Sequence, residues 1–271
     1  MSEKMTVLVV GCGNMGAALA GGYARRYPDV DVLAIDRDPA RARAMLPADS
    51  RVTVHGDFAA LSGMRPSVVI LALKPQVLGD VLSDFITLCA DALVVSIAAG
   101  VGCARLSALL GGHRRVVRAM PNLPVVVGEG MTALFGDGLS AADCATAEGI
   151  FSAVGQAAWV TDEETIDRAT AVAGSGPAYF FAFVEHLAAA GVEAGLPADL
   201  AERLARQTCI GAAALLRDDP RSAAALKAAV CSPGGTTQAG LAAMETPAGL
   251  AAIASQGVAA AFRRARELAG D

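Results

Sequence analysis

The chain has 271 residues, of which 54% are hydrophobic and 18% charged, a balance that excludes an intrinsically disordered protein. Its formal net charge of −5 argues against nucleic acid as a partner. No run of about 18 residues is apolar enough to span a membrane, and the first residues lack a signal-peptide layout. We therefore expect a globular protein with neither a membrane nor a nucleic-acid partner.

The cysteines and histidines show no arrangement typical of a metal site. The six cysteines include no CxxC pair, and the chain has only three histidines. We therefore predict no metal ion and no disulfide framework, and the cytoplasm, which is reducing, is the expected compartment. The sequence also lacks HExxH and a Ser-His-Asp spacing, so nothing indicates a hydrolase.

The first 160 residues alternate short β-branched runs with helical stretches. The predicted strands are Thr6–Val10, Val32–Asp36, Val52–Val54, Val68–Leu73, Leu93–Ile97 and Val116–Ala119. The predicted helices between them are Met15–Arg26, Val77–Leu88 and Cys103–Leu110. Continuous apolar strands separated by helices are typical of a parallel sheet that is covered on both faces. The sequence therefore predicts an α/β domain of the Rossmann type.

Beyond Trp159 the chain becomes alanine-rich and favours helix to residue 269, interrupted only by glycine and proline. We place the domain boundary between a dinucleotide-binding domain over 1–162 and an all-α dimerisation and substrate-binding domain over 163–271. The start of Tyr179–Ala194 is apolar on nearly every side, so it must be buried. Because about 110 residues of helix form only a thin core, we expect a homodimer in which a second copy covers these helices.

A glycine-rich segment joins the first predicted strand to the first predicted helix. It is Gly11-Cys12-Gly13-Asn14-Met15-Gly16, which has the spacing GxGxxG. In dinucleotide-binding domains the first glycine allows a tight turn, the second lets the backbone approach a pyrophosphate, and the third lets helix and strand pack closely. The N-terminus of the helix then faces the phosphates. All six residues are therefore predicted to bind a dinucleotide.

Asp36 follows the second predicted strand, about 20 residues beyond the glycines, where an acidic side chain can hydrogen-bond the adenosine ribose and repel a 2′-phosphate. Arg37 beside it can instead pair with that phosphate. The alternative is that both side chains simply face solvent at the end of a strand. NADH and NADPH therefore both stay open as the cofactor, and we expect NADH to be usable.

Two further segments follow predicted strands. They are Ala72-Leu73-Lys74-Pro75 and Ser96-Ile97-Ala98-Ala99-Gly100. Because ligands of open parallel sheets bind beyond the carboxyl ends of the strands, both segments are expected at the ligand-binding edge. Lys74, one of only three lysines, is predicted to lie near the ribose or phosphate of the dinucleotide, and the alternative is a solvent-facing lysine.

A second glycine-rich segment lies in the helical half, before a predicted helix over Gln238–Met244. A glycine pair before two threonines presents free backbone N–H groups and hydroxyls together, which suits a carboxylate without a basic side chain. The alternative is an ordinary capped helix start. We predict a carboxylate-binding site, and hence a small-molecule substrate, at Ser232, Gly234, Gly235, Thr236 and Thr237.

In their order and spacing these segments resemble pyrroline-5-carboxylate reductases, from about residue 6 to residue 265. Three more segments carry the resemblance: Leu73–Gln76, Arg118–Asn122 and Gly174–Tyr179. The resemblance implies a Rossmann domain followed by a helical dimerisation domain. It also implies hydride transfer from NADPH or NADH to the cyclic imine 1-pyrroline-5-carboxylate, which gives L-proline. Family enzymes often assemble further as pentamers of dimers, so the resemblance allows a homodecamer.

The resemblance also implies roles for particular residues. The segments 72–75 and 98–100 contact the cofactor, and Asn122 lies near the nicotinamide. Thr237 hydrogen-bonds the ring nitrogen of the substrate as the catalytic residue. The loop 232–237 of one subunit closes over the substrate near the cofactor of the other subunit. Asp36 departs from the family, which more often has a small or amide residue there, so the cofactor choice stays open.

Two other functions compete with this one. β-Hydroxyacid dehydrogenases carry a catalytic lysine in a helix after the Rossmann domain. Here the only lysine beyond Lys74 is Lys227, which lies outside that family's motif. A non-catalytic protein that senses NAD(P) would bind the cofactor without turning over a substrate, and the intact loop 232–237 argues against it.

Overall fold

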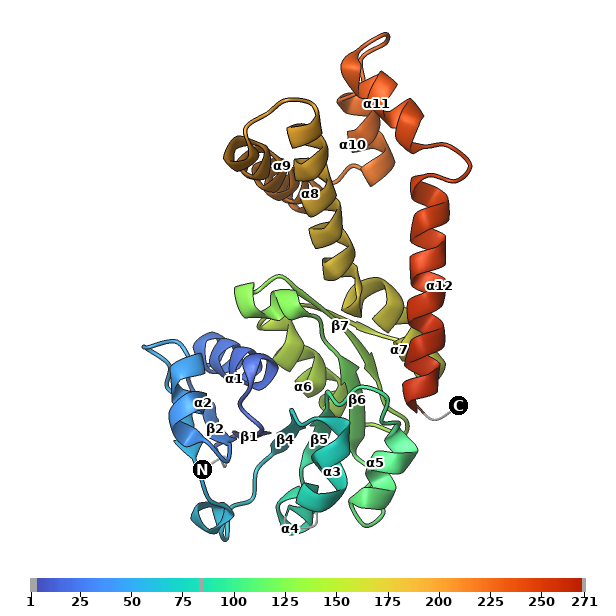
Figure 1. Cartoon of the computed structure of the whole chain (residues 1–271). Helices are drawn as coiled ribbons and strands as arrows, with labels where there is room; N and C mark the ends of the chain where they lie inside the picture. The colour runs from blue at the N-terminus through green and yellow to red at the C-terminus, as the bar shows by residue number, and fades with distance from the viewer. Residues whose placement is uncertain (1–3, 83–84, 270–271) are drawn as a thin grey trace. The chain divides into compact units, whose positions relative to one another are not determined.

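A computed structural model of the chain describes residues 4–82 and 85–269 (Figure 1). Contacts divide these residues into two compact units. The first unit comprises the residues up to Ser175 together with those from Ala261 onward, and the second is Gly176–Ala260. The chain therefore passes between the units twice, at 175/176 and at 260/261. The predicted domain boundary at 162/163 stays a prediction.

The first unit is built on an eight-stranded sheet in the order β3-β2-β1-β4-β5-β6-β7-β8. The strands are β1 Thr6–Val10, β2 Asp31–Ile35, β3 Thr53–His55, β4 Val68–Leu71, β5 Leu93–Ser96, β6 Val116–Met120, β7 Gly130–Phe135 and β8 Gly155–Trp159. Only the pairing of β6 with β7 is antiparallel among the described strands. The predicted Rossmann-type α/β fold is confirmed.

Helices cover both faces of this sheet (Figure 1). They are α1 Asn14–Arg26, α2 Pro39–Met45, α3 Pro75–Leu82, α4 Ile86–Cys89, α5 Cys103–Leu109, α6 Ala141–Ser152 and α7 Glu163–Ala169, with short turns η1 Phe58–Leu61, η2 Leu123–Val127 and η3 Thr170–Gly174. The single helix predicted over Val77–Leu88 is instead two helices, α3 and α4, and its residues 83–84 lie outside the described residues. Proline at 75 starts α3 earlier than predicted, because proline is tolerated in a first helical turn.

Alternate residues of the central strands enter two separate cores. Val7 and Val9 of β1 pack with Leu19 of α1 and Phe151 of α6. Leu8 and Val10 face the other side and pack with residues of α3, α4 and α5, including Leu78, Cys89 and Leu106. Because a strand sends successive side chains to opposite faces, a sheet buried on both sides needs continuous apolar runs. This requirement explains why β1, β4 and β5 were visible in the sequence.

The second unit is helical, with α8 Gly176–Glu193, α9 Ala198–Asp218, α10 Ala223–Ala229, α11 Thr236–Met244 and the first half of α12 Leu250–Ala269. Helix α8 was predicted to be buried, yet in the single chain Phe180 is 65% exposed and Phe181 is 61% exposed. Several large exposed aromatic side chains on one helix are typical of an interface. The exposure therefore agrees with helices that need a second copy to cover them.

All six cysteines are free thiols. Burial raises the pKa of the Cys12 and Cys89 thiols to about 11, so neither is a thiolate near pH 7. Within the described part of the chain, no helix is long and apolar enough to cross a membrane. The same residues contain no cluster of three or more potential metal ligands among His, Cys, Asp and Glu.

Candidate active site

The residues predicted to bind a cofactor lie at one edge of the sheet. Strands β1, β2, β4, β5 and β6 run parallel, so their carboxyl ends share that edge. The predicted residues follow these strands in turn, at 11–16, 36–37, 72–75, 98–100 and 122. The structure therefore brings together five segments that are far apart in the sequence, at the edge where open sheets bind ligands.

The three glycines of the first turn have three different surroundings. Gly11 has φ +91°, and a Cβ added to it would lie 2.5 Å from the carbonyl oxygen of Ala72. A Cβ on Gly16 would lie 2.0 Å from the carbonyl oxygen of Gly11, which enforces close contact between helix and strand. A Cβ on Gly13 would meet only the Arg41 guanidinium, at 3.8 Å. The space beside Gly13 therefore fits a pyrophosphate that approaches the backbone closely.

The start of α1 strengthens this fit. Gly13 is the N-cap of the helix and has no side chain that could cap it. Asn14 is exposed at the first helical position, Met15 is half-buried, and Cys12 is buried. The first backbone N–H groups of a helix have no partner within the helix, and they carry the positive end of its dipole. The N-terminus of α1 can therefore donate to phosphate oxygens.

Asp36 holds this turn from the neighbouring strand. One carboxylate oxygen accepts from the Cys12 backbone N–H at 2.8 Å, and the other accepts from the Asp38 N–H at 3.0 Å. The charge on Asp36 helps to raise the pKa of the Cys12 thiol, whereas the charge on Arg41 opposes that rise. Arg41 was not predicted as part of the cofactor site, although it lies four residues after Arg37, within the first turn of α2. Both charges therefore act at the glycine-rich turn.

The segments after β4 and β5 are fixed by hydrogen bonds from their backbone N–H groups. The Ala72 N–H donates to the Val10 carbonyl at 2.8 Å, while Lys74 beyond it is exposed. The buried Ser96 hydroxyl accepts from the Ala98 N–H at 3.3 Å. Gly100 has φ +72°, and a Cβ there would lie 2.7 Å from the Leu268 carbonyl oxygen of α12. Packing against the end of α12 therefore requires glycine at this position, independently of any contact that it makes with a cofactor.

Asn122 is placed at the same edge but is engaged by the protein. Its side chain is buried, and its oxygen accepts from the Met131 backbone N–H at 2.8 Å. Its Nδ2 donates to the Ala173 carbonyl at 3.0 Å. Because the Met131 N–H can only donate, these contacts also fix which way the amide points. Both ends of the Asn122 amide therefore bind backbone.

The predicted substrate residues form the start of α11 in the second unit. The Gly234 N–H donates to Gln238 Oε1 at 2.7 Å, and the Gly235 N–H donates to the Ser232 carbonyl at 3.0 Å. Their amides are thus used inside the loop. The helix begins at Thr236, two residues earlier than predicted, and both threonines are exposed. The backbone N–H groups of Thr236 and Thr237, in its first turn, are therefore available to a carboxylate.

Gln238 was not predicted as part of this loop. It stands three residues after Gly235, the N-cap of α11. A glutamine at this position commonly reaches back to backbone N–H groups at the start of a helix. The position of Gln238 in the sequence therefore indicated this contact, but the prediction considered only the glycines and threonines.

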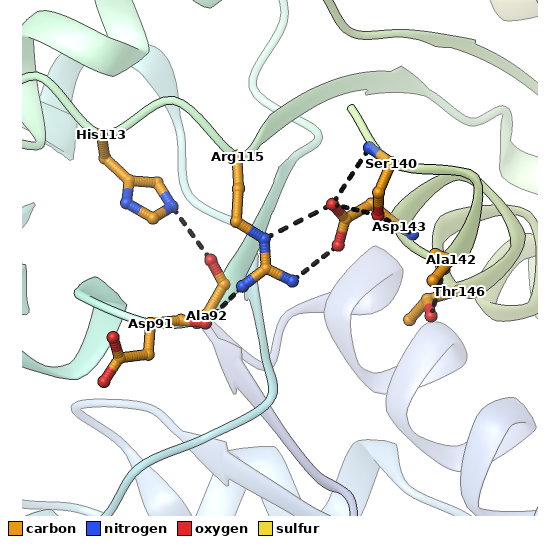
Figure 2. Close-up of polar contacts among 8 residues, drawn as sticks. All are labelled: Asp91, Ala92, His113, Arg115, Ser140, Ala142, Asp143 and Thr146. Carbon is orange, nitrogen blue, oxygen red and sulfur yellow. Dashed lines mark hydrogen bonds and ion pairs between the residues drawn. The ribbon is translucent and has the colours of Figure 1, made fainter. Parts of the chain in front are cut away.

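A separate polar cluster lies at the opposite end of β6, which begins at Val116 (Figure 2). Arg115 Nη2 lies 2.6 Å from the Asp143 carboxylate, which also accepts from the Ser140 hydroxyl. Hydrogen bonds from Arg115 and Ser140 hold the pKa of Asp143 below its usual value. One ring nitrogen of His113 lies 2.9 Å from the Ala92 carbonyl oxygen. This cluster fastens the start of α6 to the sheet, away from the ligand-binding edge.

Comparison with known families agrees with both halves of this description. Residues 163–268 match the family described as pyrroline-5-carboxylate reductase dimerisation. Residues 6–100 match the family described as coenzyme F420-dependent NADP oxidoreductase. The first match covers most of the helical half, and the second covers the strands that carry four of the five predicted cofactor segments.

Individual relatives match over three quarters of the chain or nearly all of it. The pyrroline-5-carboxylate reductase of Pseudomonas aeruginosa is 39% identical and covers 97% of this chain and 96% of its own. That of Synechocystis is 45% identical over 74% of each chain. The solved structure of a Coxiella burnetii pyrroline-5-carboxylate reductase has a TM-score of 0.88 at 32% identity and covers 98% of this chain and 99% of its own. The structure of the Plasmodium falciparum pyrroline carboxylate reductase with NADP bound has a TM-score of 0.79 at 26% identity, covering 98% of this chain and 99% of its own. The chain therefore belongs to the pyrroline-5-carboxylate reductase family.

Proposed function

We propose that this chain reduces 1-pyrroline-5-carboxylate to L-proline, with the cofactor bound at the carboxyl edge of the sheet and the substrate carboxylate bound at the N-terminus of an α11 helix. It is an oxidoreductase that acts on an imine and uses NADPH or NADH. The observation that best supports the proposed cofactor site is the open space beside Gly13, where a Cβ would meet only Arg41. It distinguishes this glycine from Gly11 and Gly16, whose surroundings explain them structurally.

Each predicted cofactor-binding segment has a role that follows from its place at the carboxyl edge of the sheet. The backbone at Gly13 and the N-terminus of α1 hold the pyrophosphate, and Asp36 and Arg37 lie at the adenosine ribose. The segments 72–75 and 98–100 flank the cofactor beyond β4 and β5. When it is bound, the reduced nicotinamide supplies the hydride that the substrate receives.

The substrate is a cyclic imine that carries a carboxylate. The backbone N–H groups of Thr236 and Thr237 bind the carboxylate, and the loop residues Ser232, Gly234 and Gly235 shape this cradle. The Thr237 hydroxyl hydrogen-bonds the ring nitrogen. A protonated imine is already electrophilic, so the protein needs to supply position more than acid. Such positioning contributes up to about 7–11 kcal/mol in favourable cases.

The domain organisation and the assembly are part of the proposal. We divide the chain at 162/163, and the family match that begins at residue 163 supports this division. The dimerisation family match and the exposed aromatic side chains of α8 support a homodimer through the helical domain. We propose that five dimers assemble into a decamer and that the loop 232–237 of one subunit serves the cofactor of the other. The six free thiols support a cytoplasmic location.

The direct experiment follows the loss of absorbance at 340 nm when the purified protein is mixed with NADPH or NADH and pyrroline-5-carboxylate. Oxidation of the cofactor with stoichiometric formation of proline is the expected result. Cofactor binding without turnover would instead identify a non-catalytic NAD(P)-sensing protein. Oxidation of a β-hydroxyacid with NAD(P)+, without imine reduction, would identify the dehydrogenase alternative.

A further inference from the structure

One side of β6 holds the segment that leads into the helical unit. Arg118 Nη2 lies 2.5 Å from Asp167 of α7. A Cβ on Gly174 would lie 3.4 Å from the Met120 side chain, and Asn122 donates to the Ala173 carbonyl. Arg118 and Met120 point to the same side of β6, and Asn122 follows two residues after its end, so the three residues contact one continuous segment, 163–174. We call these three residues the β6 anchor.

The polar contacts of the β6 anchor are buried and specific. The Arg118 side chain is 5% exposed, and its guanidinium also lies 3.4 Å from Glu163. The Glu163 carboxylate in turn accepts from the Cys103 N–H at 2.8 Å. A buried ion pair adds little net stability, because desolvation of both charges offsets their attraction. Its effect is to fix one orientation of α7 on the sheet.

The same segment also contacts the end of the chain. The Arg168 guanidinium of α7 lies 5.7 Å from the centroid of the Phe262 ring. Phe262 follows the second passage between the units, at 260/261, and Ala173 precedes the first, at 175/176. The segment 163–174 therefore borders both points at which the chain passes between the two units.

Asn122 has a specific task in this anchor. In a helix the carbonyl of Ala173 would accept from the N–H four residues later, but residue 177 is proline and has no N–H. Thr170–Gly174 forms a π-turn, in which the Ser175 N–H donates to the Thr170 carbonyl at 2.9 Å. Ala173 is half-buried, and a carbonyl that is shielded from water without a donor costs free energy. The Asn122 Nδ2 supplies the donor that Pro177 lacks.

We propose that Asn122 is a positioning residue for the reaction rather than a ligand of the nicotinamide. It acts through the Ala173 carbonyl and fixes the chain where it leaves the cofactor-binding unit for the helical unit. The inference rests on the proposed function, because the step it supports is the placement of the imine against the cofactor. Both polar ends of its amide are already bound to backbone, so loss of Asn122 affects substrate placement and not cofactor affinity.

Asn122→Asp tests this directly. The aspartate keeps an oxygen for the Met131 N–H but turns an oxygen toward the Ala173 carbonyl. At pH 8 we expect kcat/KM for pyrroline-5-carboxylate to fall about tenfold or more, while the Kd of NADP+ or NAD+, measured by calorimetry, changes less than about twofold. A protonated carboxyl can donate to the carbonyl. The loss relative to wild type therefore shrinks as the pH falls through the pKa of the new side chain.

Restoring the missing N–H provides a rescue. Pro177→Ala gives residue 177 a donor for the Ala173 carbonyl, so Asn122→Ala should lower the melting temperature and kcat/KM less in the Pro177→Ala background than in the wild type. Pro220→Ala, a substitution in an exposed loop, controls for the general effect of removing a proline and should give no rescue. The melting temperatures report this coupling even if the wild type turns over no imine, which separates failure of the proposed function from failure of this inference.

Two results would overturn the assignment. A large rise in the Kd of the dinucleotide in Asn122→Asp, with the substrate KM unchanged, would make Asn122 a cofactor ligand. Equal losses from Asn122→Ala in both backgrounds would show that the Ala173 carbonyl does not need it. If Asn122→Asp does not fold, the cycle of Asn122→Ala and Pro177→Ala decides by melting temperature.

Discussion

The Asp36 carboxylate accepts a hydrogen bond from the Cys12 backbone N–H at 2.8 Å, so the residue that follows β2 also holds the glycine-rich turn that follows β1. Asp36 therefore has two roles. In the proposed site its charge faces the adenosine ribose, and its hydrogen bond stabilises the turn proposed to hold the phosphates. We therefore expect cofactor choice and cofactor affinity to be coupled through this one side chain.

Asp36→Ser should raise the preference for NADPH over NADH. Removing the charge relieves repulsion of a 2′-phosphate, and Arg37 and Arg41 remain close by. At an effective dielectric of about 20 the repulsion at 4 Å is about 4 kcal/mol, and screening reduces it, so we expect a shift in the kcat/KM ratio of about 10- to 100-fold. The ratio is measured with both cofactors, with Arg37→Ala as the opposite control. A strong NADPH preference of the wild type that survives Arg37→Ala contradicts this view of the pair.

Gly13→Ala should weaken dinucleotide binding, whereas Gly16→Ala should lower the stability of the fold. The added methyl at Gly13 has room in the free protein but occupies the space assigned to the pyrophosphate. We expect a nearly unchanged melting temperature with at least about a tenfold rise in the dinucleotide Kd. At Gly16 the methyl would lie 2.0 Å from a carbonyl oxygen, which costs about 2 kcal/mol or more of unfolding free energy. Calorimetry and denaturant unfolding measure the two effects, and equal destabilisation by both would remove the distinction.

Thr237→Ala should lower kcat/KM for the imine by about 1–3 kcal/mol, or roughly 5- to 150-fold, because the ring nitrogen loses its partner. The dinucleotide Kd should stay unchanged, since Thr237 lies outside the sheet edge that carries the cofactor segments. Thr237→Ser keeps the hydroxyl and serves as the matched control. An unchanged kcat/KM in Thr237→Ala would remove this residue from the mechanism.

Asp143→Asn should destabilise the protein at neutral pH but not in acid. The pKa of Asp143 is lowered in the folded state by Arg115, so its contribution is present above the unfolded pKa and is lost as the pH falls through the lower folded value. Because Arg115 is half exposed, screening limits the effect to about 1 kcal/mol. Urea unfolding at pH 7 and near pH 3 measures it. A difference between variant and wild type that persists undiminished in acid would contradict the ion-pair explanation.

The sequence indicated the parallel core of the fold but not its last strands. Strands β1 to β6 are mostly β-branched and were predicted to within one or two residues at each end. Gly130–Phe135 and Gly155–Trp159 contain glycine, alanine and few β-branched residues, so their local preference for strand is weak. Their place in the sheet is decided by pairing with β6, which no local pattern reveals. The antiparallel turn of β6 into β7 was missed for the same reason.

The residues of the candidate site also differ in whether the sequence could predict them, and for the same physical reason. The glycine-rich turn and Asp36 could be predicted because each follows a strand at a spacing that is set by local geometry. The contact of Asn122 with Ala173 could not, because the two residues are 51 positions apart and meet only when α7 packs on β6. The missing N–H of Pro177 was nevertheless visible in the sequence. Whether the Ala173 carbonyl needs another donor depends on the helical path through 170–177, which the sequence did not predict.

In the proposed site the start of α11 binds the carboxylate of the substrate. A crystal structure of the protein with NADP+ or NAD+ and L-proline tests it most directly. We expect the proline carboxylate to lie within hydrogen-bond distance of the Thr236 and Thr237 backbone N–H groups, with the ring nitrogen at the Thr237 hydroxyl. A bound proline whose carboxylate pairs with other groups, while those two amides face solvent, would contradict it.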